Sequence, residues 1–270
     1  MKIGIVGLGL IGGSLAKTIS KKTSHTVCGY DIDESIKERA LRDGSIAMWG
    51  KENAVDCDIT FVCLYPKQAV DFINENNFSG IVCDICGVKG WVYDHIKNKG
   101  IDYVGAHPMA GREFSGYLWS EDNLFEGASF IITKAEKSNP ESVNTVANLA
   151  KQLEFGKIVI TTVEEHDRVI AYTSQLAHVV SNAYVKSDTA NRFEGYSAGS
   201  FQDLTRVARL DPDMWTQLFL MNPQPLSDEI GIIIENLKKY KEAIDKGDSE
   251  ELRRLLKEGS DIKKRLNGEV

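Results

Sequence analysis

Short apolar runs alternate with amphipathic stretches through the first 160 residues. The apolar runs are β-branched and nearly continuous, which predicts strands buried on both faces over residues 2–6, 26–30, 59–64, 81–84, 103–106, 130–133 and 157–160. A 3.6-residue periodicity predicts helices over residues 11–21, 34–43, 67–76, 88–98 and 140–153. This alternation predicts an α/β fold with a parallel sheet covered by helices on both faces.

The pattern changes after residue 162. Strand signals almost vanish, and helical periodicity runs through residues 163–186, 214–221, 225–246 and 249–266. Residues 163–270 are therefore expected to form an all-helical second domain. Its core would be small, and Ile230, Ile233, Ile234 and Leu237 form an apolar stripe suited to a second copy of the chain. We predict a homodimer held together by this domain.

Composition narrows the class of protein. The 270 residues include 32 Lys and Arg and 39 Asp and Glu, a net charge of −7 without a long basic run, which argues against a nucleic-acid partner. The longest apolar run, residues 3–13, is too short to span a bilayer and too rich in glycine for a secretory signal, so we expect a cytoplasmic protein without a membrane partner.

Five cysteines, three of them in strand-like runs, indicate free thiols in a reducing compartment. Cys83 and Cys86 lack a second pair of ligands, so no metal is expected.

The run Gly7-Leu8-Gly9-Leu10-Ile11-Gly12 directly follows the first predicted strand and opens the first predicted helix. In such a motif the first glycine permits a tight turn, the second lets backbone N–H groups approach a pyrophosphate, and the third lets helix and strand pack closely. The helix N-terminus adds a partial positive charge. This context predicts a Rossmann-type, doubly wound dinucleotide-binding domain over residues 1–162, with Gly7, Gly9, Leu10, Ile11 and Gly12 at the cofactor.

Asp31 ends the second predicted strand, 19 residues after Gly12, where a carboxylate can accept hydrogen bonds from the ribose hydroxyls. A 2′-phosphate would meet this carboxylate, with Asp33 close behind, so NAD is favoured over NADP. Leu64 and Cys86, at the ends of two later strands, are also expected to contact the cofactor.

His107 directly follows the strand predicted over residues 103–106, at the carboxyl end of the sheet, where ligands bind. A histidine there can accept the proton of a substrate hydroxyl during hydride transfer, and activity would fall as the imidazole protonates near neutral pH. The alternative is a loop histidine that only caps a strand. His25, His95 and His166 have no evident partners in the sequence.

Two further groups also have alternative interpretations. His178 shares a polar helical stripe with Asp167 and Ser174, which indicates either a wet pocket wall or a satisfied buried histidine. Asp203 and Arg206 are three residues apart in a predicted helix. They form either a surface ion pair or an arginine that binds a substrate carboxylate and is oriented by its neighbour.

Taken together, several runs resemble the prephenate dehydrogenase family, which includes arogenate and cyclohexadienyl dehydrogenases. The resemblance covers nearly the whole chain. It rests on residues 7–15, 88–90, 107–111, 124–127, 165–167, 201–208 and 211–215, of which the runs around His107 and Arg206 are specific in combination.

The resemblance implies oxidative decarboxylation of prephenate to 4-hydroxyphenylpyruvate with hydride transfer to NAD+, in tyrosine biosynthesis; arogenate is the alternative substrate. It implies that His107 bonds the C4 hydroxyl and assists its deprotonation, and that Arg206 binds a substrate carboxylate. Glu113 and Asp203 would position that arginine, His178 would line the pocket, and Trp215 would approach from the second subunit of a homodimer. Neither the regulatory domain nor the fused chorismate mutase of some relatives is expected.

The chain departs from the family pattern at three places. Gly87 stands where many relatives have a serine that can bond the C4 hydroxyl or the cofactor. Residues 174–178 read Ser-Gln-Leu-Ala-His, where many relatives have Ser-His-Leu-Pro-His. Arg112 replaces a Thr or Lys, either as a second carboxylate ligand or as a partner of Glu113.

Two rival functions stay open. One is a dehydrogenase of the same architecture that acts on a β-hydroxy acid or an imine. Such enzymes use a lysine in the helical domain, and here the first long helix offers only Lys186. The other is a non-catalytic NAD-binding sensor.

Overall fold

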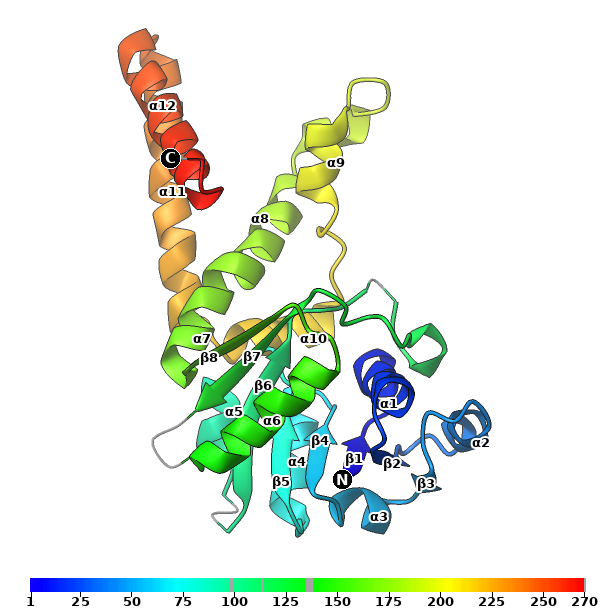
Figure 1. The fold of residues 1–270 in the computed structure, drawn as a ribbon. Coiled ribbons are helices and arrows are strands. Elements are labelled where there is room, and N and C mark those ends of the chain that lie inside the picture. The colour runs from blue at the N-terminus through cyan, green and yellow to red at the C-terminus, as the bar shows by residue number, and fades with distance from the viewer. Residues whose placement is uncertain (98–99, 113, 135–137, 270) are drawn as a thin grey trace. The chain divides into compact units, whose positions relative to one another are not determined.

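The computed structural model describes all residues except 98–99, 113, 135–137 and 270 (Figure 1). Contacts divide the chain into two compact units. Unit 1 comprises Met1–Ile170 and Asp211–Asn222, and unit 2 comprises Ala171–Leu210 and Pro223–Val270. The functional boundary predicted between residues 162 and 163 stays a prediction, because compactness alone does not test it.

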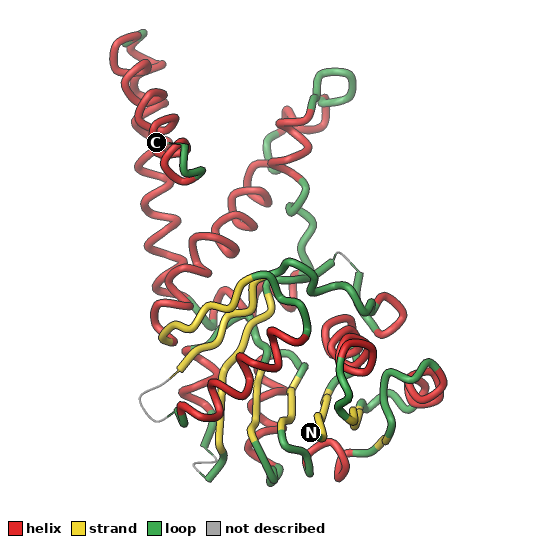
Figure 2. The backbone as a smooth tube through the Cα atoms, viewed as in Figure 1, coloured by secondary structure: helices red, strands yellow, loops and turns green. Residues whose placement is uncertain are grey.

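Unit 1 contains an eight-stranded sheet in the order β3-β2-β1-β4-β5-β6-β7-β8 (Figure 2). The strands are β1 (Lys2–Val6), β2 (Thr26–Tyr30), β3 (Met48–Trp49), β4 (Ile59–Val62), β5 (Ile81–Asp84), β6 (Asp102–Pro108), β7 (Ser129–Lys134) and β8 (Lys157–Thr162). The order of the first six is that of a Rossmann sheet, with the reversal of strand order between β1 and β4. The predicted α/β fold is confirmed.

The sheet departs from the predicted all-parallel arrangement at one pair of strands. β7 runs antiparallel to β6, so that His107 lies opposite Ile131, while β8 is again parallel to β7. A parallel connection needs a crossover segment, usually a helix, packed on the sheet. The described residues between β6 and β7 contain only a short 3₁₀ turn, η1 (Tyr117–Trp119), and the chain therefore returns antiparallel.

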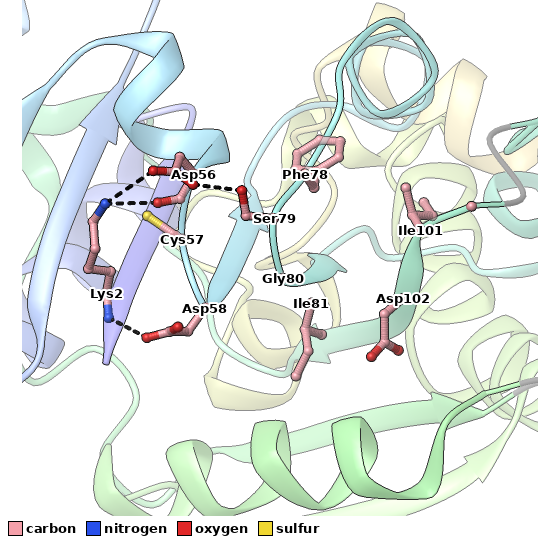
Figure 3. A pocket seen from close by; sticks show the side chains of 11 residues that line it. Lys2, Asp56, Cys57, Asp58, Phe78, Ser79, Gly80, Ile81, Ile101 and Asp102 are labelled. Atoms are coloured by element: carbon pink, nitrogen blue, oxygen red, sulfur yellow. Dashed lines mark hydrogen bonds and ion pairs between the residues drawn. The ribbon is translucent and has the colours of Figure 1, made fainter.

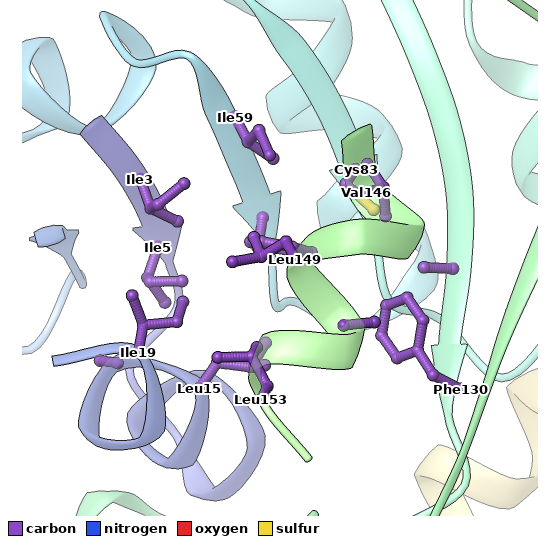
Figure 4. Close-up of a cluster of buried hydrophobic side chains, with 14 of the residues drawn as sticks. Ile3, Ile5, Leu15, Ile19, Ile59, Cys83, Phe130, Val146, Leu149 and Leu153 are labelled. Atoms are coloured by element: carbon purple, nitrogen blue, oxygen red, sulfur yellow. The ribbon is translucent and has the colours of Figure 1, made fainter. Parts of the chain in front are cut away.

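Helices cover both faces of this sheet. On one face lie α1 (Leu10–Lys22), α2 (Ser35–Arg42) and α6 (Pro140–Gln152), whose apolar side chains pack with Ile3, Ile59 and other strand residues (Figure 4). On the other face lie α4 (Pro66–Glu75), α5 (Gly90–His95) and α10 (Pro212–Leu220). Phe61 packs with the first group and its neighbour Val62 with the second, as the pleat of a strand requires. This double burial explains why the strands are nearly continuous apolar runs.

Short elements and element ends differ most from the predictions. β3 and α3 (Lys51–Val55) were not expected, because two and five residues are too few to establish a periodicity. β6 extends to Pro108 and so includes His107, which the sequence placed just after the strand. α5 ends at His95, short of the predicted residue 98, which lies outside the described residues.

The described part of unit 2 consists of helices and loops (Figure 2). Its elements are η2 (Ala171–Gln175), α8 (Leu176–Tyr184), η3 (Asp188–Arg192), α9 (Gly199–Thr205), α11 (Pro223–Lys246) and α12 (Ser249–Leu266). The helix predicted over residues 163–186 is observed as three successive segments: α7 (Val163–Ile170) in unit 1, then the π-helical η2, then α8. Among the described helices, none is both long enough and apolar enough to cross a bilayer.

Candidate active site

The loop after β1 has the shape that its glycines predict. Gly7 has φ +89°, its N–H donates to the Tyr30 carbonyl at 2.8 Å, and a Cβ there would lie 2.5 Å from the Cys63 carbonyl oxygen. A Cβ on Gly12 would lie 1.9 Å from the Gly7 carbonyl oxygen. A Cβ on Gly9 would meet nothing within 4 Å. The loop is thus tightly packed at Gly7 and Gly12 and open at Gly9, where the first N–H groups of α1, including those of Leu10 and Ile11, lack a side-chain cap.

Asp31 lies beside this loop. The Leu8 N–H donates to its Oδ2 at 2.7 Å, and the Asp33 N–H donates to its Oδ1 at 2.9 Å. Each carboxylate oxygen has a second lone pair for a ribose hydroxyl. The residues present therefore fit a dinucleotide with free adenosine ribose hydroxyls.

Leu64 and Cys86 lie just beyond the carboxyl ends of β4 and β5. The Leu64 Cδ2 would be 2.8 Å from a Cβ on Gly7, so this side chain adjoins the phosphate loop. The Cys86 thiol donates to the Leu64 carbonyl at 3.7 Å, and burial raises the pKa of this thiol well above its ordinary value. The structure brings both residues to the predicted edge of the sheet, and their contact with a cofactor stays a prediction.

His107 belongs to a chain of hydrogen-bonded side chains, which we call the histidine relay: His107, His166 and Asp167. The Nδ1 of His107 lies 3.0 Å from the Nε2 of His166, and the Nδ1 of His166 lies 2.7 Å from the Oδ1 of Asp167. The N–H groups of Lys89 and Gly90 donate to the two oxygens of Asp167 at 2.9 and 2.7 Å. The interpretation of His166 as a histidine without partners is therefore wrong. Its one sequence signal was the Glu165-His166-Asp167 run directly after a strand.

A buried ion pair lies next to the relay. The Lys89 ammonium donates to Asp84 Oδ1 at 2.6 Å, and both side chains are fully buried. Asp84 also accepts hydrogen bonds from the Tyr103 hydroxyl and from the Cys86 N–H, the latter at 2.8 Å. A buried charge is tolerated only with such partners. Sequence reasoning missed Asp84 and Lys89 as members of the site.

Both histidines of the relay have lowered pKa values, which favours the neutral imidazoles. Burial, followed by the neighbouring His166 and Lys89, lowers the pKa of His107 well below its ordinary value. Burial also lowers the pKa of His166, although its hydrogen bond to Asp167 acts in the opposite direction. The decline of activity in acid, which the sequence predicts near neutral pH, is then expected at lower pH.

Gly87 faces the other nitrogen of His107. A Cβ on Gly87 would lie 3.6 Å from the His107 Nε2, which is ordinary van der Waals contact. A side chain at residue 87 would thus adjoin the nitrogen that the relay leaves unused, and this chain has none there.

In unit 2, hydrogen bonds from α8 hold the segment that contains Arg206. The Nδ1–H of His178 donates to the Val207 carbonyl at 3.2 Å, the Ser181 hydroxyl to the Leu204 carbonyl at 2.7 Å, and the Asn182 amide to the Ala208 carbonyl at 3.0 Å. Burial is the main cause that lowers the pKa of His178, and the charge of Arg206 contributes. The structure thus brings together His178 and Arg206, two residues that were predicted to bind substrate.

The other predicted substrate residues are less connected. Within the described chain, no ion pair joins Asp203 to Arg206, although both lie in or directly after α9. Glu113 lies outside the described residues. Arg112 forms its ion pair with Glu121. Trp215 lies in α10, with its ring 5.3 Å from that of Phe219.

A separate hollow of about 470 Å³ lies at the opposite edge of the sheet (Figure 3). Its lining includes Lys2, Gly80 and Asp102, next to or at the amino ends of β1, β5 and β6. Sheets of this type bind ligands at the carboxyl ends of their strands. We therefore place the active site at the edge that carries the Gly7–Gly12 loop and His107, and not in this hollow.

Comparisons with known proteins identify the family. A family model described as "Prephenate dehydrogenase, nucleotide-binding domain" matches residues 15–160, and one described as "Prephenate dehydrogenase, dimerization domain" matches residues 162–258. The chain is 30% identical to a prephenate dehydrogenase of Bacillus subtilis (strain 168) over 96% of this chain and 74% of the relative. It is 31% identical to a cyclohexadienyl dehydrogenase of Zymomonas mobilis over 95% and 92% of the two chains.

Two solved structures are similar over nearly their full lengths. Synechocystis arogenate dehydrogenase has a TM-score of 0.86 and 26% identity, with 98% of this chain and 100% of that chain covered. Prephenate dehydrogenase from A. aeolicus, in complex with hydroxyphenyl propionate and NAD+, has a TM-score of 0.86 and 29% identity, with 98% of each chain covered. These matches confirm the resemblance found in the sequence, and the chain belongs to the prephenate dehydrogenase family.

Proposed function

We propose that the protein catalyses the NAD+-dependent oxidative decarboxylation of prephenate to 4-hydroxyphenylpyruvate, a step of tyrosine biosynthesis. Membership of the family supports a dehydrogenase, and the relatives are named as prephenate, cyclohexadienyl and arogenate dehydrogenases. The observation that carries the proposal is the placement of His107. It lies on the same edge of the sheet as the phosphate loop, with Nδ1 engaged by His166 and Nε2 toward Gly87.

The cofactor is proposed to bind at the loop after β1. Gly9 and the N–H groups of Leu10 and Ile11 would contact the pyrophosphate, and Asp31 would accept hydrogen bonds from the ribose. Asp31 would also repel a 2′-phosphate, which favours NAD+ over NADP+. NAD+, when bound, supplies the acceptor for the hydride that leaves C4 of the substrate.

His107 is proposed as the general base. Its Nε2 takes the proton of the C4 hydroxyl while C4 loses hydride and becomes a carbonyl carbon. The bond between C1 and the ring carboxylate then breaks, CO2 leaves, and the electron pair enters the ring to form an aromatic phenolate. The phenolate recovers a proton to give the phenol. Because aromatisation drives the reaction, the protein has to position C4 and polarise one hydroxyl.

Six residues are proposed to recognise the substrate. Arg206 would bind a carboxylate by charge-assisted hydrogen bonds, and His178 would line the pocket beside it. Asp203 and Glu113 would orient the arginine. Trp215 is proposed to reach the site of a second subunit. Arg112 would need to leave Glu121 to bind a second carboxylate.

We propose that the protein is a homodimer formed through unit 2. The helices α11 and α12 expose large apolar side chains on unit 2: Ile232, Ile234, Leu237, Ile244, Leu256, Ile262 and Leu266. Exposed apolar side chains in such number are typical of a permanent interface. The name of the second matching family model, a dimerization domain, agrees with it. Sedimentation of a fully active monomer at micromolar concentration would contradict this proposal.

The test of the function is an assay of NADH formation with prephenate and with arogenate, each with NAD+ and with NADP+. We expect the highest kcat/KM for prephenate with NAD+. A higher value for arogenate would overturn the choice of substrate, and no reduced cofactor with either substrate would overturn the activity. A non-catalytic NAD-binding protein would show binding of NAD+ without turnover.

A further inference from the structure

We propose that His166 and Asp167 are positioning residues that fix the tautomer of His107, so that its Nε2 presents a lone pair to the substrate hydroxyl. The identity of that hydroxyl rests on the proposed function. The tautomer itself depends only on contacts within unit 1.

The assignment starts at Asp167, whose partners can only donate to it. The backbone N–H groups of Lys89 and Gly90 donate to Oδ1 and Oδ2, and the Nδ1 of His166 lies 2.7 Å from Oδ1. A carboxylate accepts and does not donate. The proton between His166 and Asp167 therefore belongs to the Nδ1 of His166.

The protons of the two rings follow in turn. A neutral imidazole carries one N–H, so His166 with a proton on Nδ1 has a bare Nε2. The Nδ1 of His107, 3.0 Å away, must then donate to that Nε2. With its single proton on Nδ1, neutral His107 has its lone pair on Nε2, the nitrogen beside Gly87.

The surroundings keep the relay in this arrangement. A Cβ on Gly90 would lie 2.9 Å from the Asp167 Oδ2, so only glycine permits the close approach of this backbone. The same loop is anchored by the Lys89 side chain, whose ammonium is buried against Asp84. The charged groups around the two rings are Lys89, Asp84 and Asp167. Burial and the Lys89 charge lower the pKa of both histidines, whereas Asp167 and Asp84 act in the opposite direction on the pKa of His166.

The relay also prepares the site for the charge that forms during reaction. When Nε2 of His107 takes a proton, the positive charge of the ring is shared through the hydrogen bond to His166 and faces the carboxylate of Asp167 at the far end. Preorganised hydrogen bonds of this type stabilise a charge that develops in the transition state. The α7 helix would thus take part in catalysis through two residues that do not contact the substrate.

The first experiment measures the tautomers directly. In ¹⁵N-histidine-labelled full-length protein at neutral pH, two-bond ¹H–¹⁵N spectra show which ring nitrogen of each histidine carries the proton. We expect both His107 and His166 to be protonated on Nδ1. A proton on Nε2 of His107 would overturn the proposal, whatever the substrate is.

The second experiment compares two substitutions of the same residue. His166→Leu removes the acceptor, and we expect kcat to fall by about 10²-fold with KM changed by less than about threefold. His166→Gln can offer an oxygen to His107 and an N–H to Asp167 at once, and we expect it to keep His107 protonated on Nδ1 and to recover most of kcat. The exposed His95, which stacks on Trp91 outside the relay, supplies the control His95→Gln.

The outcomes separate the relay from the overall function. The positioning role would be overturned if His166→Leu kept the kcat of the wild type. It would also be overturned if His166→Leu and His166→Gln lost kcat equally while His107 stayed protonated on Nδ1 in both variants. Absence of turnover with prephenate and arogenate, together with the expected tautomers, would overturn the proposed function and leave the relay intact. Binding of NAD+ by each variant verifies that it is folded.

Discussion

The two units of this protein present their chemical groups in opposite ways. In unit 1, His107 is linked through His166 to a carboxylate that accepts two backbone N–H groups, next to a fully buried ion pair. In unit 2, the exposed Arg206 lies in a segment that is fixed by hydrogen bonds from α8 to backbone carbonyls. In unit 1 the buried contacts control the protonation state of His107. In unit 2 the hydrogen bonds fix the backbone around Arg206 and leave its guanidinium accessible.

The difference follows from the task proposed for each group. A general base needs a defined tautomer and a controlled pKa, and both require burial and fixed partners. An arginine is always charged, so it needs only a fixed attachment point and access to the carboxylate. Substitutions in the two units should therefore fail in different ways.

The largest effect is expected for His107→Asn. Asparagine is polar and of similar reach but cannot take the proton, so kcat should fall by about 10²–10⁴-fold while NAD+ affinity is kept. Because the neutral imidazole is the active form and its pKa is lowered, wild-type activity should persist through neutral pH and decline only in more acidic solution. The variant should lose that acidic decline. Near-normal kcat with an unchanged pH profile would reduce His107 to a structural role.

Arg206→Gln should affect binding more than chemistry. The arginine is proposed to bind a carboxylate in both the ground and the transition state, so KM should rise. The fall in kcat/KM should correspond to a loss of about 2–4 kcal/mol in transition-state stabilisation. Arg209→Gln, a nearby exposed arginine, is the matched control. If Arg206→Gln lowered kcat at saturating substrate as strongly as His107→Asn does, the contrast between the two units would be lost.

Asp31→Ser tests the cofactor half of unit 1 separately. Loss of the ribose contact should raise the KM for NAD+ by about 10- to 100-fold and narrow the preference for NAD+ over NADP+, since a hydrogen bond to a charged group is worth about 1.5–3 kcal/mol. Asp31 also accepts the Leu8 and Asp33 N–H groups, so thermal stability is measured in parallel. Asp71→Ser, at an exposed aspartate of α4, serves as the control. An unchanged ratio of the two cofactors would show that Asp31 does not face the ribose.

The smallest effect is expected for Gly87→Ser, which adds the side chain common in relatives. Its Cβ would be in ordinary contact with the His107 Nε2, so the fold should tolerate it. One added hydrogen bond near the C4 hydroxyl should lower the KM for substrate by about two- to tenfold, because such a bond contributes about 0.5–1.5 kcal/mol. A large loss of kcat would instead indicate that the serine hydroxyl donates a hydrogen bond to the Nε2 of His107 and so prevents this nitrogen from accepting the substrate proton.

Sequence reasoning succeeded where the determinant is local. The Gly7–Gly12 loop, the strands around it and the amphipathic helices follow from glycine conformation and from the period of apolar residues, which neighbours in the chain specify by themselves. The α/β fold and the helical second half were predictable for the same reason. His107 and Arg206 were candidates from their positions in the sequence, and the family resemblance gave them specific roles, which stay predictions.

The tertiary structure decided what depends on distant contacts. His107 and His166 are 59 residues apart in the sequence. Only the pairing of β6 within the sheet and the path of α7 after β8 bring the Nδ1 of His107 to 3.0 Å from the Nε2 of His166. Apart from the Glu165-His166-Asp167 run, nothing in the sequence distinguishes His166 from His25 and His95, for which no partners were evident either. The direction of β7 likewise depends on the absence of a crossover helix in the described chain after β6. Periodicity specifies which faces are apolar, whereas packing decides which polar groups meet, because each buried donor requires an acceptor that the rest of the fold supplies.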